Sequence, residues 1–112
     1  MADLSSLPTY QRLLCLDFDG TMINSREEPH LYPGLMEKIQ SLQTEGAAWL
    51  INTGRRMEWL MDGLSTYHFP FMPDFIIAEE SLLFVPNGKG GWTDDIPWNH
   101  TRRAYYDDVQ VR

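Results

Sequence analysis

Two carboxylates separated by a single phenylalanine follow an apolar run near the start of the sequence. They are Asp17 and Asp19, in the stretch LLCLDFDGTMINS over residues 13–25. Residues two positions apart share one face of a strand, so the two carboxylates are predicted to converge while Phe18 points into the core. Two such anions repel each other unless a divalent cation binds them or one of them holds a proton. Carboxylate oxygens of this kind suit Mg²⁺, which also takes water and phosphate oxygens as ligands.

Two other interpretations of this stretch stay open. Asp17 and Asp19 could simply end the strand in a solvated turn with Gly20. A calcium-binding loop that begins at Asp17 would have Asp19 and Glu28 at ligand positions. However, Met22 then stands where such a loop needs glycine, and the preceding run is typical of a strand instead of a helix.

A second polar cluster follows a later apolar run, in the stretch LINTGRR over residues 50–56. Thr53 offers a hydroxyl, Gly54 permits close approach to the backbone, and Arg55 offers a guanidinium. A predicted helix begins directly afterwards, and the N–H groups of its first turn lack partners within the helix. These are the parts of a phosphate-binding loop, although Thr53 could also be an ordinary helix cap beside a turn at Gly54.

The elements that must position both clusters alternate in type along the chain. Short apolar runs predict strands and segments with one apolar face predict helices, which gives an α/β protein with a parallel sheet and right-handed crossovers. The first run is expected to be a strand covered on both faces. Ligands bind such sheets at the carboxyl ends of the strands, where both polar clusters fall. Strands are predicted at 12–18, 47–53 and 74–80, and residues 81–93 are predicted to be a strand that enters a Gly-rich turn. The predicted helices lie at 33–46 and 56–69, and a weakly helical segment lies at 97–112.

The composition narrows the classes of partner. The chain has 112 residues and a formal net charge of −7, which excludes a nucleic-acid partner, because phosphate neutralisation needs clustered Lys and Arg. No apolar run approaches the roughly 18 residues of a membrane span and no secretory leader is recognisable, so we expect a soluble cytoplasmic protein with no membrane partner. The single cysteine, Cys15, excludes an intrachain disulfide and is expected to be a buried, inert thiol.

In this order, LDFDGTMINS and WLINTGRR resemble the first and second motifs of the haloacid dehalogenase-like (HAD) phosphohydrolases, and most closely the capped, sugar-phosphatase-type branch. The resemblance covers residues 13–85. It implies a Rossmann-like parallel sheet with flanking helices, and Mg²⁺-dependent hydrolysis of a small phosphomonoester such as a sugar phosphate. It also implies that Asp17 is the nucleophile that forms an aspartyl-phosphate, and that Asp19 is the general acid and base.

The resemblance assigns roles to the neighbouring residues as well. Mg²⁺ would contact the Asp17 carboxylate and the Asp19 backbone carbonyl. Gly20 and Thr21 would follow the nucleophile into the loop that closes over it. Thr53 and the Gly54 N–H would hold phosphate oxygens, and Arg55 would bind substrate or a cap domain.

The sequence also departs from this family. The later lysine and acidic-pair motifs are not recognisable, and we expect the candidates for them to lie on the surface: Lys38, Lys89, Asp94, Asp95, Asp107 and Asp108. Many relatives have Asn-Gly after the third strand where this chain has AEES. Glu79 or Glu80 could face the site there, although a solvated turn is the expectation.

Two hypotheses follow from these departures. In the first, the chain is the amino-terminal portion of a longer phosphatase, with an extension at 1–12, the HAD-like core at 13–91 and the start of a cap at 92–112; this isolated chain would then hydrolyse phosphomonoesters poorly. In the second, the chain is a catalytically inactive binding or interaction module. Exposed sheet edges and a small core leave room for self-association as a homo-oligomer in that case.

Overall fold

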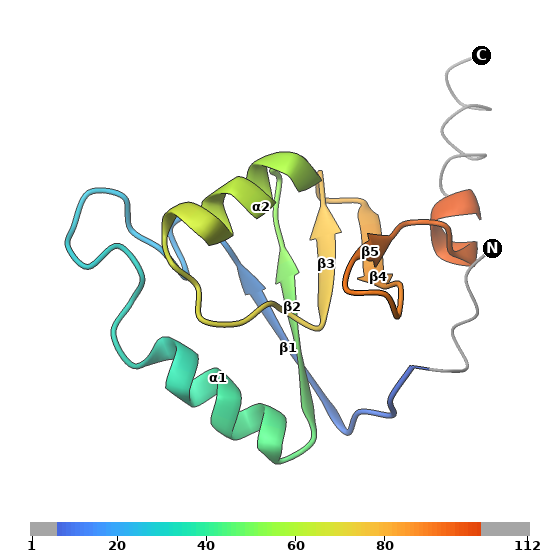
Figure 1. Ribbon diagram of the computed structural model, residues 1–112, viewed down its shortest axis with the longest axis horizontal. Helices are drawn as coiled ribbons and strands as arrows, with labels where there is room; N and C mark the ends of the chain where they lie inside the picture. Colours follow the sequence, from blue (N-terminus) through green and yellow to red (C-terminus); the bar gives the residue numbers. More distant parts are fainter. Residues whose placement is uncertain (1–6, 102–112) are drawn as a thin grey trace.

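Strands and helices alternate over the first three strands, as the apolar patterns predict, and two further strands follow (Figure 1). The structure is a computed structural model and describes residues 7–101. The elements are β1 (Arg12–Asp17), α1 (Leu35–Thr44), β2 (Ala47–Asn52), α2 (Met57–Thr66), β3 (Phe75–Ala78), β4 (Leu82–Pro86) and β5 (Trp92–Thr93). Residues 97–101 are helical, and the rest of the segment predicted to be weakly helical lies outside the described residues.

The five strands form one sheet in the order β1-β2-β3-β4-β5, which confirms the α/β class. The sheet is parallel from β1 to β3, as predicted, and antiparallel at β4 and β5. The reversal follows from the connection between β3 and β4, which is far too short for the crossover that a parallel pair needs. The register pairs Asp17 with Asn52 and Asn52 with Ile77, so the carboxyl ends of the three parallel strands meet at one edge.

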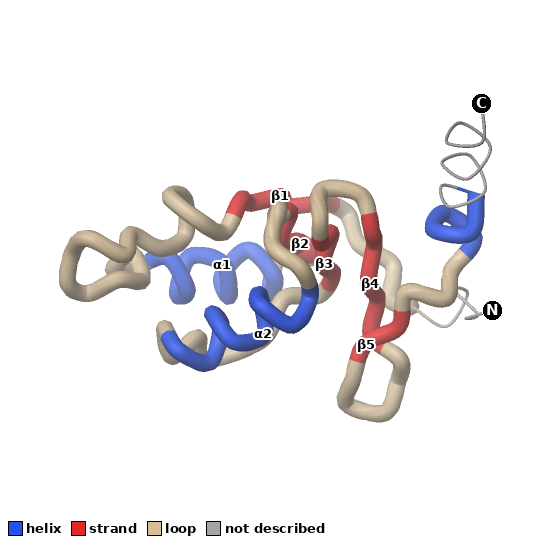
Figure 2. The backbone as a smooth tube through the Cα atoms, turned by 90° about the horizontal axis from the view of Figure 1, so that it is seen from above, coloured by secondary structure: helices blue, strands red, loops and turns tan. Residues whose placement is uncertain are grey.

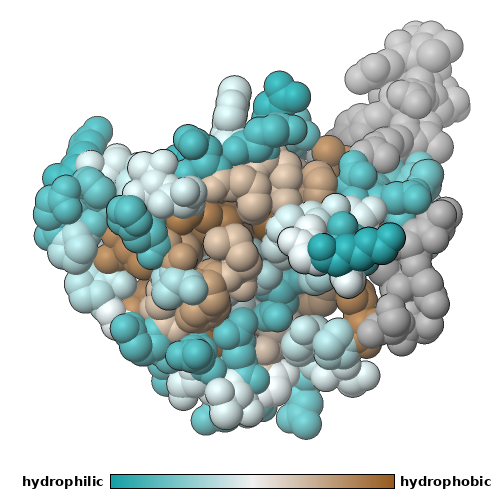
Figure 3. All heavy atoms as spheres, in the orientation of Figure 1, coloured by the Kyte–Doolittle hydropathy of each residue, from teal (hydrophilic) through white to brown (hydrophobic). Residues whose placement is uncertain are grey.

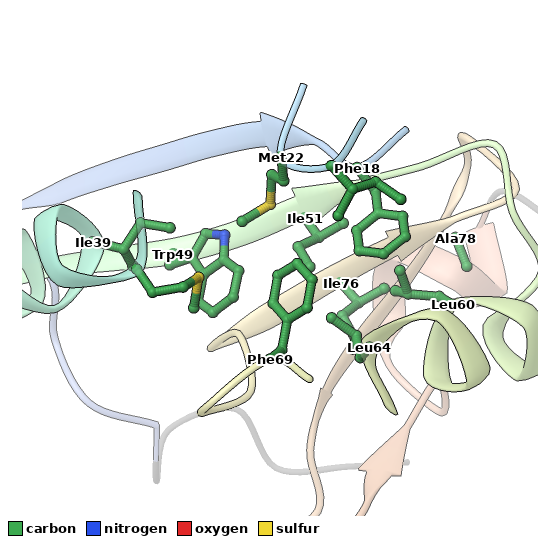
Figure 4. Close-up of a cluster of buried hydrophobic side chains, with 12 residues drawn as sticks. Phe18, Met22, Ile39, Trp49, Ile51, Leu60, Leu64, Phe69, Ile76 and Ala78 are labelled. Atoms are coloured by element: carbon green, nitrogen blue, oxygen red, sulfur yellow. The ribbon is translucent and has the colours of Figure 1, made fainter. Parts of the chain in front are cut away.

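Both helices cover the same face of the parallel strands (Figure 2). The chain moves in one direction across the sheet from β1 to β3, and right-handed crossovers then place both connections on one side. The core fills the space between these helices and the sheet (Figure 4). Its fully buried members include Phe18, Met22, Ile23, Ile39, Trp49, Ile51, Leu60, Leu64 and Ile76.

Strand β1 is exposed, so the prediction that it is covered on both faces is wrong. It lies at an edge of the sheet, and its side chains are exposed or only half-buried up to Asp17. Leu13 is 60% exposed, and Cys15 is exposed where a buried thiol was expected. The reason is that both helices lie on the opposite face, so Leu13, Cys15 and Asp17 have no layer packed over them in the part of the chain that is described.

Apolar surface is also visible between α1 and α2 on the helical side of the molecule (Figure 3). A groove of about 570 Å³ lies there, with Met36, Pro70 and Phe71 in its lining. None of the helices within residues 7–101 has the length and apolar character needed to cross a bilayer.

Asp74 joins three parts of the chain just before β3. Its carboxylate accepts hydrogen bonds from the Trp49 backbone N–H at 2.8 Å, the Gln43 side-chain amide at 2.9 Å and the Tyr10 hydroxyl at 3.4 Å. These donors come from β2, from α1 and from the segment that leads into β1. The carboxylate therefore fixes the start of β3 against the first βα unit.

Removing this carboxylate with Asp74→Ala is expected to lower the free energy of unfolding by about 2 kcal/mol, because three part-buried donors lose a charged partner. Urea denaturation followed by circular dichroism measures the change. Glu27→Ala is the matched control, since Glu27 is exposed in a loop, and it is expected to change stability by less than about 0.5 kcal/mol. Equal losses in the two variants would contradict the role given to Asp74.

Candidate active site

A pocket of about 260 Å³ opens at the carboxyl ends of β1 and β2, where the sequence predicted a site. It is lined by Cys15, Asp17, Asn52, Thr53, Gly54 and Glu80. Three of the predicted site residues, Asp17, Thr53 and Gly54, are thus brought together from segments that are far apart in the sequence. The parallel register accounts for this, because Asp17 pairs with Asn52, the residue directly before Thr53.

The chain turns sharply after Asp17, and Phe18 anchors the turn. The Phe18 side chain is fully buried, as predicted, while its N–H donates to Asp17 Oδ1 at 2.9 Å. Its carbonyl accepts the N–H groups of Thr21, Met22 and Ile23 at 3.4, 3.0 and 3.3 Å. The loop therefore folds back onto Phe18, which leaves the Asp17 carboxylate exposed at the end of the strand.

Asp19 lies beyond the end of β1, so strand alternation does not determine where its side chain points. Its carboxylate accepts two hydrogen bonds from Arg55, from Nε to Oδ2 at 2.8 Å and from Nη2 to Oδ1 at 2.7 Å. Asp19 and Gly20 line a second concavity of about 400 Å³, together with Asn24, Ser25, Arg26 and Tyr32. Asp17 and Asp19 thus line different pockets, and the Asp19 carboxylate is paired with the Arg55 guanidinium.

The Arg55 guanidinium is held on three sides. Besides the pair with Asp19, Nη1 donates to the Trp59 carbonyl at 3.1 Å, and the guanidinium carbon lies 5.0 Å from the centre of the Phe18 ring. Hydrogen bonding to Asp19 raises the pKa of Arg55 above its ordinary value, so the guanidinium keeps its charge. The predicted site residues Asp19 and Arg55 therefore form one fixed pair above Phe18.

Gly63 makes room for this arrangement. A β-carbon at Gly63 would lie 2.8 Å from Arg55 Nη1, closer than real side chains tolerate, and 3.0 Å from Phe18 Cε2, which is tighter than most real contacts. Glycine costs helical stability inside α2, where alanine would be favoured by about 1 kcal/mol. The close approach of the guanidinium gives a physical reason for glycine at this position.

Thr53 is 2% exposed and fixed by its backbone, because its N–H donates to the Ile77 carbonyl at 2.9 Å. Its hydroxyl oxygen accepts the Arg55 N–H at 3.1 Å. The capping residue of α2 is Arg56, and no side chain caps the helix, so the alternative that Thr53 caps it is wrong. Thr53 instead shapes the loop between β2 and α2, on the pocket wall opposite Asp17.

Glu80 lines the pocket, a placement that the sequence left open but did not favour. Its side chain reaches the pocket because the turn after β3 holds its backbone beside Thr53. The Glu80 N–H donates a hydrogen bond to the Thr53 carbonyl at 2.9 Å. The signal in the sequence was the pair of consecutive glutamates directly after the third predicted strand. Surface positions were expected for several other charged residues. Lys38, Lys89 and Asp95 are exposed, Asp94 is half-buried, and Asp107 and Asp108 lie outside the described residues.

The oxygen donors at the end of β1 are of the type that Mg²⁺ binds. They are the Asp17 carboxylate and the Asp19 backbone carbonyl, and a hard divalent cation prefers such ligands. Among residues 7–101, no three His, Cys, Asp or Glu side chains gather as a group that could hold a metal. Mg²⁺ at this position would therefore keep several water or phosphate oxygens, as it commonly does in proteins.

Comparisons with known proteins add no relative to this picture. No protein-family model matches the sequence, and no curated protein matches it. The geometry of the pocket and the chemistry of its residues are thus the basis for a functional proposal.

Proposed function

We propose that this protein belongs to the HAD-like phosphohydrolases and is a Mg²⁺-dependent phosphomonoester hydrolase that acts on small metabolites such as sugar phosphates. One observation carries the proposal: the exposed Asp17 carboxylate shares a pocket with Thr53 and Gly54. A nucleophile and a phosphate-binding loop must face each other in this way for direct attack on phosphorus. The resemblance of LDFDGTMINS and WLINTGRR to the motifs of that family supports the same function.

In this proposal an Asp17 oxygen attacks phosphorus and the bond from phosphorus to the leaving alcohol breaks. Asp19 gives the departing alkoxide its proton, and then accepts a proton from the water that hydrolyses the aspartyl-phosphate. The Thr53 hydroxyl and the Gly54 N–H hold phosphate oxygens. The Asp17 carboxylate and the Asp19 carbonyl would hold Mg²⁺, which would supply positive charge to neutralise the phosphate.

The pair between Asp19 and Arg55 adds a condition to this sequence of steps. Both Asp19 oxygens accept hydrogen bonds from Arg55, and a carboxylate paired in this way has no proton to give. The pair must therefore open and Asp19 must take up a proton from solvent before it acts as the acid. A substrate phosphate dianion competes with Asp19 for the same guanidinium. Substrate binding thus releases Asp19 for its role as acid and base in this account.

The setting of the reaction is part of the proposal. The partner in this proposal is a small phosphorylated metabolite in the cytoplasm, which suits a pocket of about 260 Å³. Neither nucleic acid nor a membrane is involved, in keeping with the acidic chain. Attraction of phosphate then depends on local groups, Mg²⁺ and Arg55, because the overall charge of −7 opposes it.

Fluoroberyllate tests the proposal without requiring rapid turnover, because it imitates a phosphoryl group attached to a carboxylate. Fluorine NMR of the protein with beryllium, fluoride and Mg²⁺ is expected to show bound fluoride that disappears when Mg²⁺ is left out. Mg²⁺ is also expected to raise the melting temperature, in line with RT ln(1 + [L]/Kd). No bound fluoride and an unchanged melting temperature would contradict the proposal and favour an inactive binding module.

A further inference from the structure

The turn between β3 and β4 carries two glutamates in a backbone conformation that suits other residues. Glu79 and Glu80 have φ angles of 52° and 60°, in the left-handed region. Consecutive residues of this kind form a type I′ turn, for which Asn-Gly is strongly preferred, and side chains such as glutamate fit poorly. Local backbone preference therefore does not explain the two glutamates at this turn.

The turn is attached directly to the phosphate-binding loop. The Glu79 N–H donates to the Arg55 carbonyl and the Glu80 N–H donates to the Thr53 carbonyl, both at 2.9 Å. The Ser81 N–H closes the turn on the Ala78 carbonyl at 3.1 Å. These bonds fix the Glu80 backbone relative to Thr53 and Gly54, so its side chain projects from a fixed point beside the pocket.

The Glu80 carboxylate lies beside Gly54. Glu80 Oε1 is 3.6 Å from the point where a β-carbon of Gly54 would stand, within van der Waals contact. Glu80 is exposed, as is Asp17, and both residues line the same pocket. The described lining thus has two carboxylates and no basic side chain, because the Arg55 guanidinium is directed to Asp19.

We propose that Glu80 is a specificity residue that discriminates against phosphate esters whose leaving group carries a negative charge, and that the substrates have neutral or positively charged leaving groups. The inference rests on the proposed function, since it needs the phosphate at Thr53 and Gly54. The phosphate group itself is attracted by Mg²⁺ and by Arg55 once the pair of Arg55 with Asp19 has opened. A second anion on the leaving group would instead lie near Glu80, where repulsion is stronger than in bulk water.

Three phosphate esters of similar size test this charge filter. They are O-phosphoethanolamine, ethyl phosphate and phosphoglycolate, whose leaving groups are positive, neutral and negative. Calorimetric titration of the full chain with Mg²⁺ at low salt is expected to give about tenfold weaker binding of phosphoglycolate than of ethyl phosphate. O-phosphoethanolamine is expected to bind at least as tightly as ethyl phosphate. The difference between the neutral and negative esters is expected to shrink as sodium chloride is added.

Variants of the two neighbouring glutamates distinguish an effect of the Glu80 carboxylate at its position from an effect of the protein's net charge. Glu80→Gln is expected to reduce the tenfold difference to within about twofold, whereas Glu79→Gln, with the same change in charge, is expected to keep it. Glu80→Gly is a second test of the carboxylate, because glycine adopts a φ of 60° freely and preserves the turn. Urea denaturation shows that each variant is folded.

The outcomes distinguish this inference from the function on which it rests. An unchanged difference in both Glu80→Gln and Glu80→Gly, with ethyl phosphate still bound, would overturn the charge filter and leave the phosphatase proposal intact. An equal loss of discrimination in Glu79→Gln would overturn it too, because net charge would then be the cause. Failure of all three esters to bind the unaltered protein would overturn both proposals.

Discussion

Asp17→Asn is expected to abolish fluoroberyllate binding and to reduce any Mg²⁺-dependent hydrolysis of p-nitrophenyl phosphate to the rate without protein, a loss of at least about a thousandfold. The amide oxygen is neutral and a poor nucleophile, so it can neither bond to phosphorus nor coordinate beryllium as the carboxylate does. The same substitution removes the carboxylate that would bind Mg²⁺. Fluorine NMR and a colorimetric assay measure the two effects separately.

Cys15→Ser is the matched control for this substitution. Cys15 lies two residues earlier on the same face of β1, is exposed and lines the same pocket, but has no part in the proposed chemistry. It is expected to keep both fluoroberyllate binding and hydrolysis within about twofold. Bound fluoride in Asp17→Asn, or an equal loss in Cys15→Ser, would show that position 17 is not the point of attack.

The α/β class and the helix and strand segments were predictable because they depend on local patterns. The run AAWLIN gives a buried strand, and its neighbours α1 and α2 place apolar residues at helical spacing. The burial of Phe18 was predictable for the same reason. Each of these depends on side-chain type and spacing within a few residues, which the sequence displays directly.

The exposure of β1 was not predictable in this way. The run LLCL in β1 is as apolar as a strand covered on both faces, and the difference lies in what packs against it. Cys15 is exposed because both crossover helices lie on the other face of the sheet, which is a property of the topology. Local apolarity therefore predicted the strand correctly, but the prediction that the strand is buried was wrong.

The candidate site likewise has some features that the order of the elements predicts and others that depend on tertiary packing. Asp17, Thr53 and Gly54 meet because they end neighbouring parallel strands, which the order of elements already implied. The pairing of Asp19 with Arg55 depends on the turn after β1, where strand alternation no longer applies. Glu80 reaches the pocket through backbone bonds between two loops, and no spacing in the sequence encodes those bonds.

Phe18 joins the site to the core, and its substitution is expected to have the largest effect on stability. The side chain is fully buried between the sheet and α2, with ring centres 5.5 Å from Phe69 and 6.4 Å from Tyr67. Phe18→Ala is expected to lower the free energy of unfolding by about 3–5 kcal/mol, because it removes most of a buried ring and leaves a cavity. Urea denaturation measures this loss, which is a large part of the stability of a domain of this size.

Phe18→Leu separates the packing of this ring from its contact with Arg55. Leucine keeps most of the buried volume, so a smaller loss of about 1–1.5 kcal/mol is expected, and the fold persists. The aromatic face beneath the Arg55 guanidinium is lost, however, and with it one of the contacts that fix the pair with Asp19. Arg55 then exchanges between Asp19 and other positions, which broadens the NMR signals of its guanidinium protons. Unchanged Arg55 signals in Phe18→Leu would show that Asp19 and the Trp59 carbonyl hold the guanidinium without the ring.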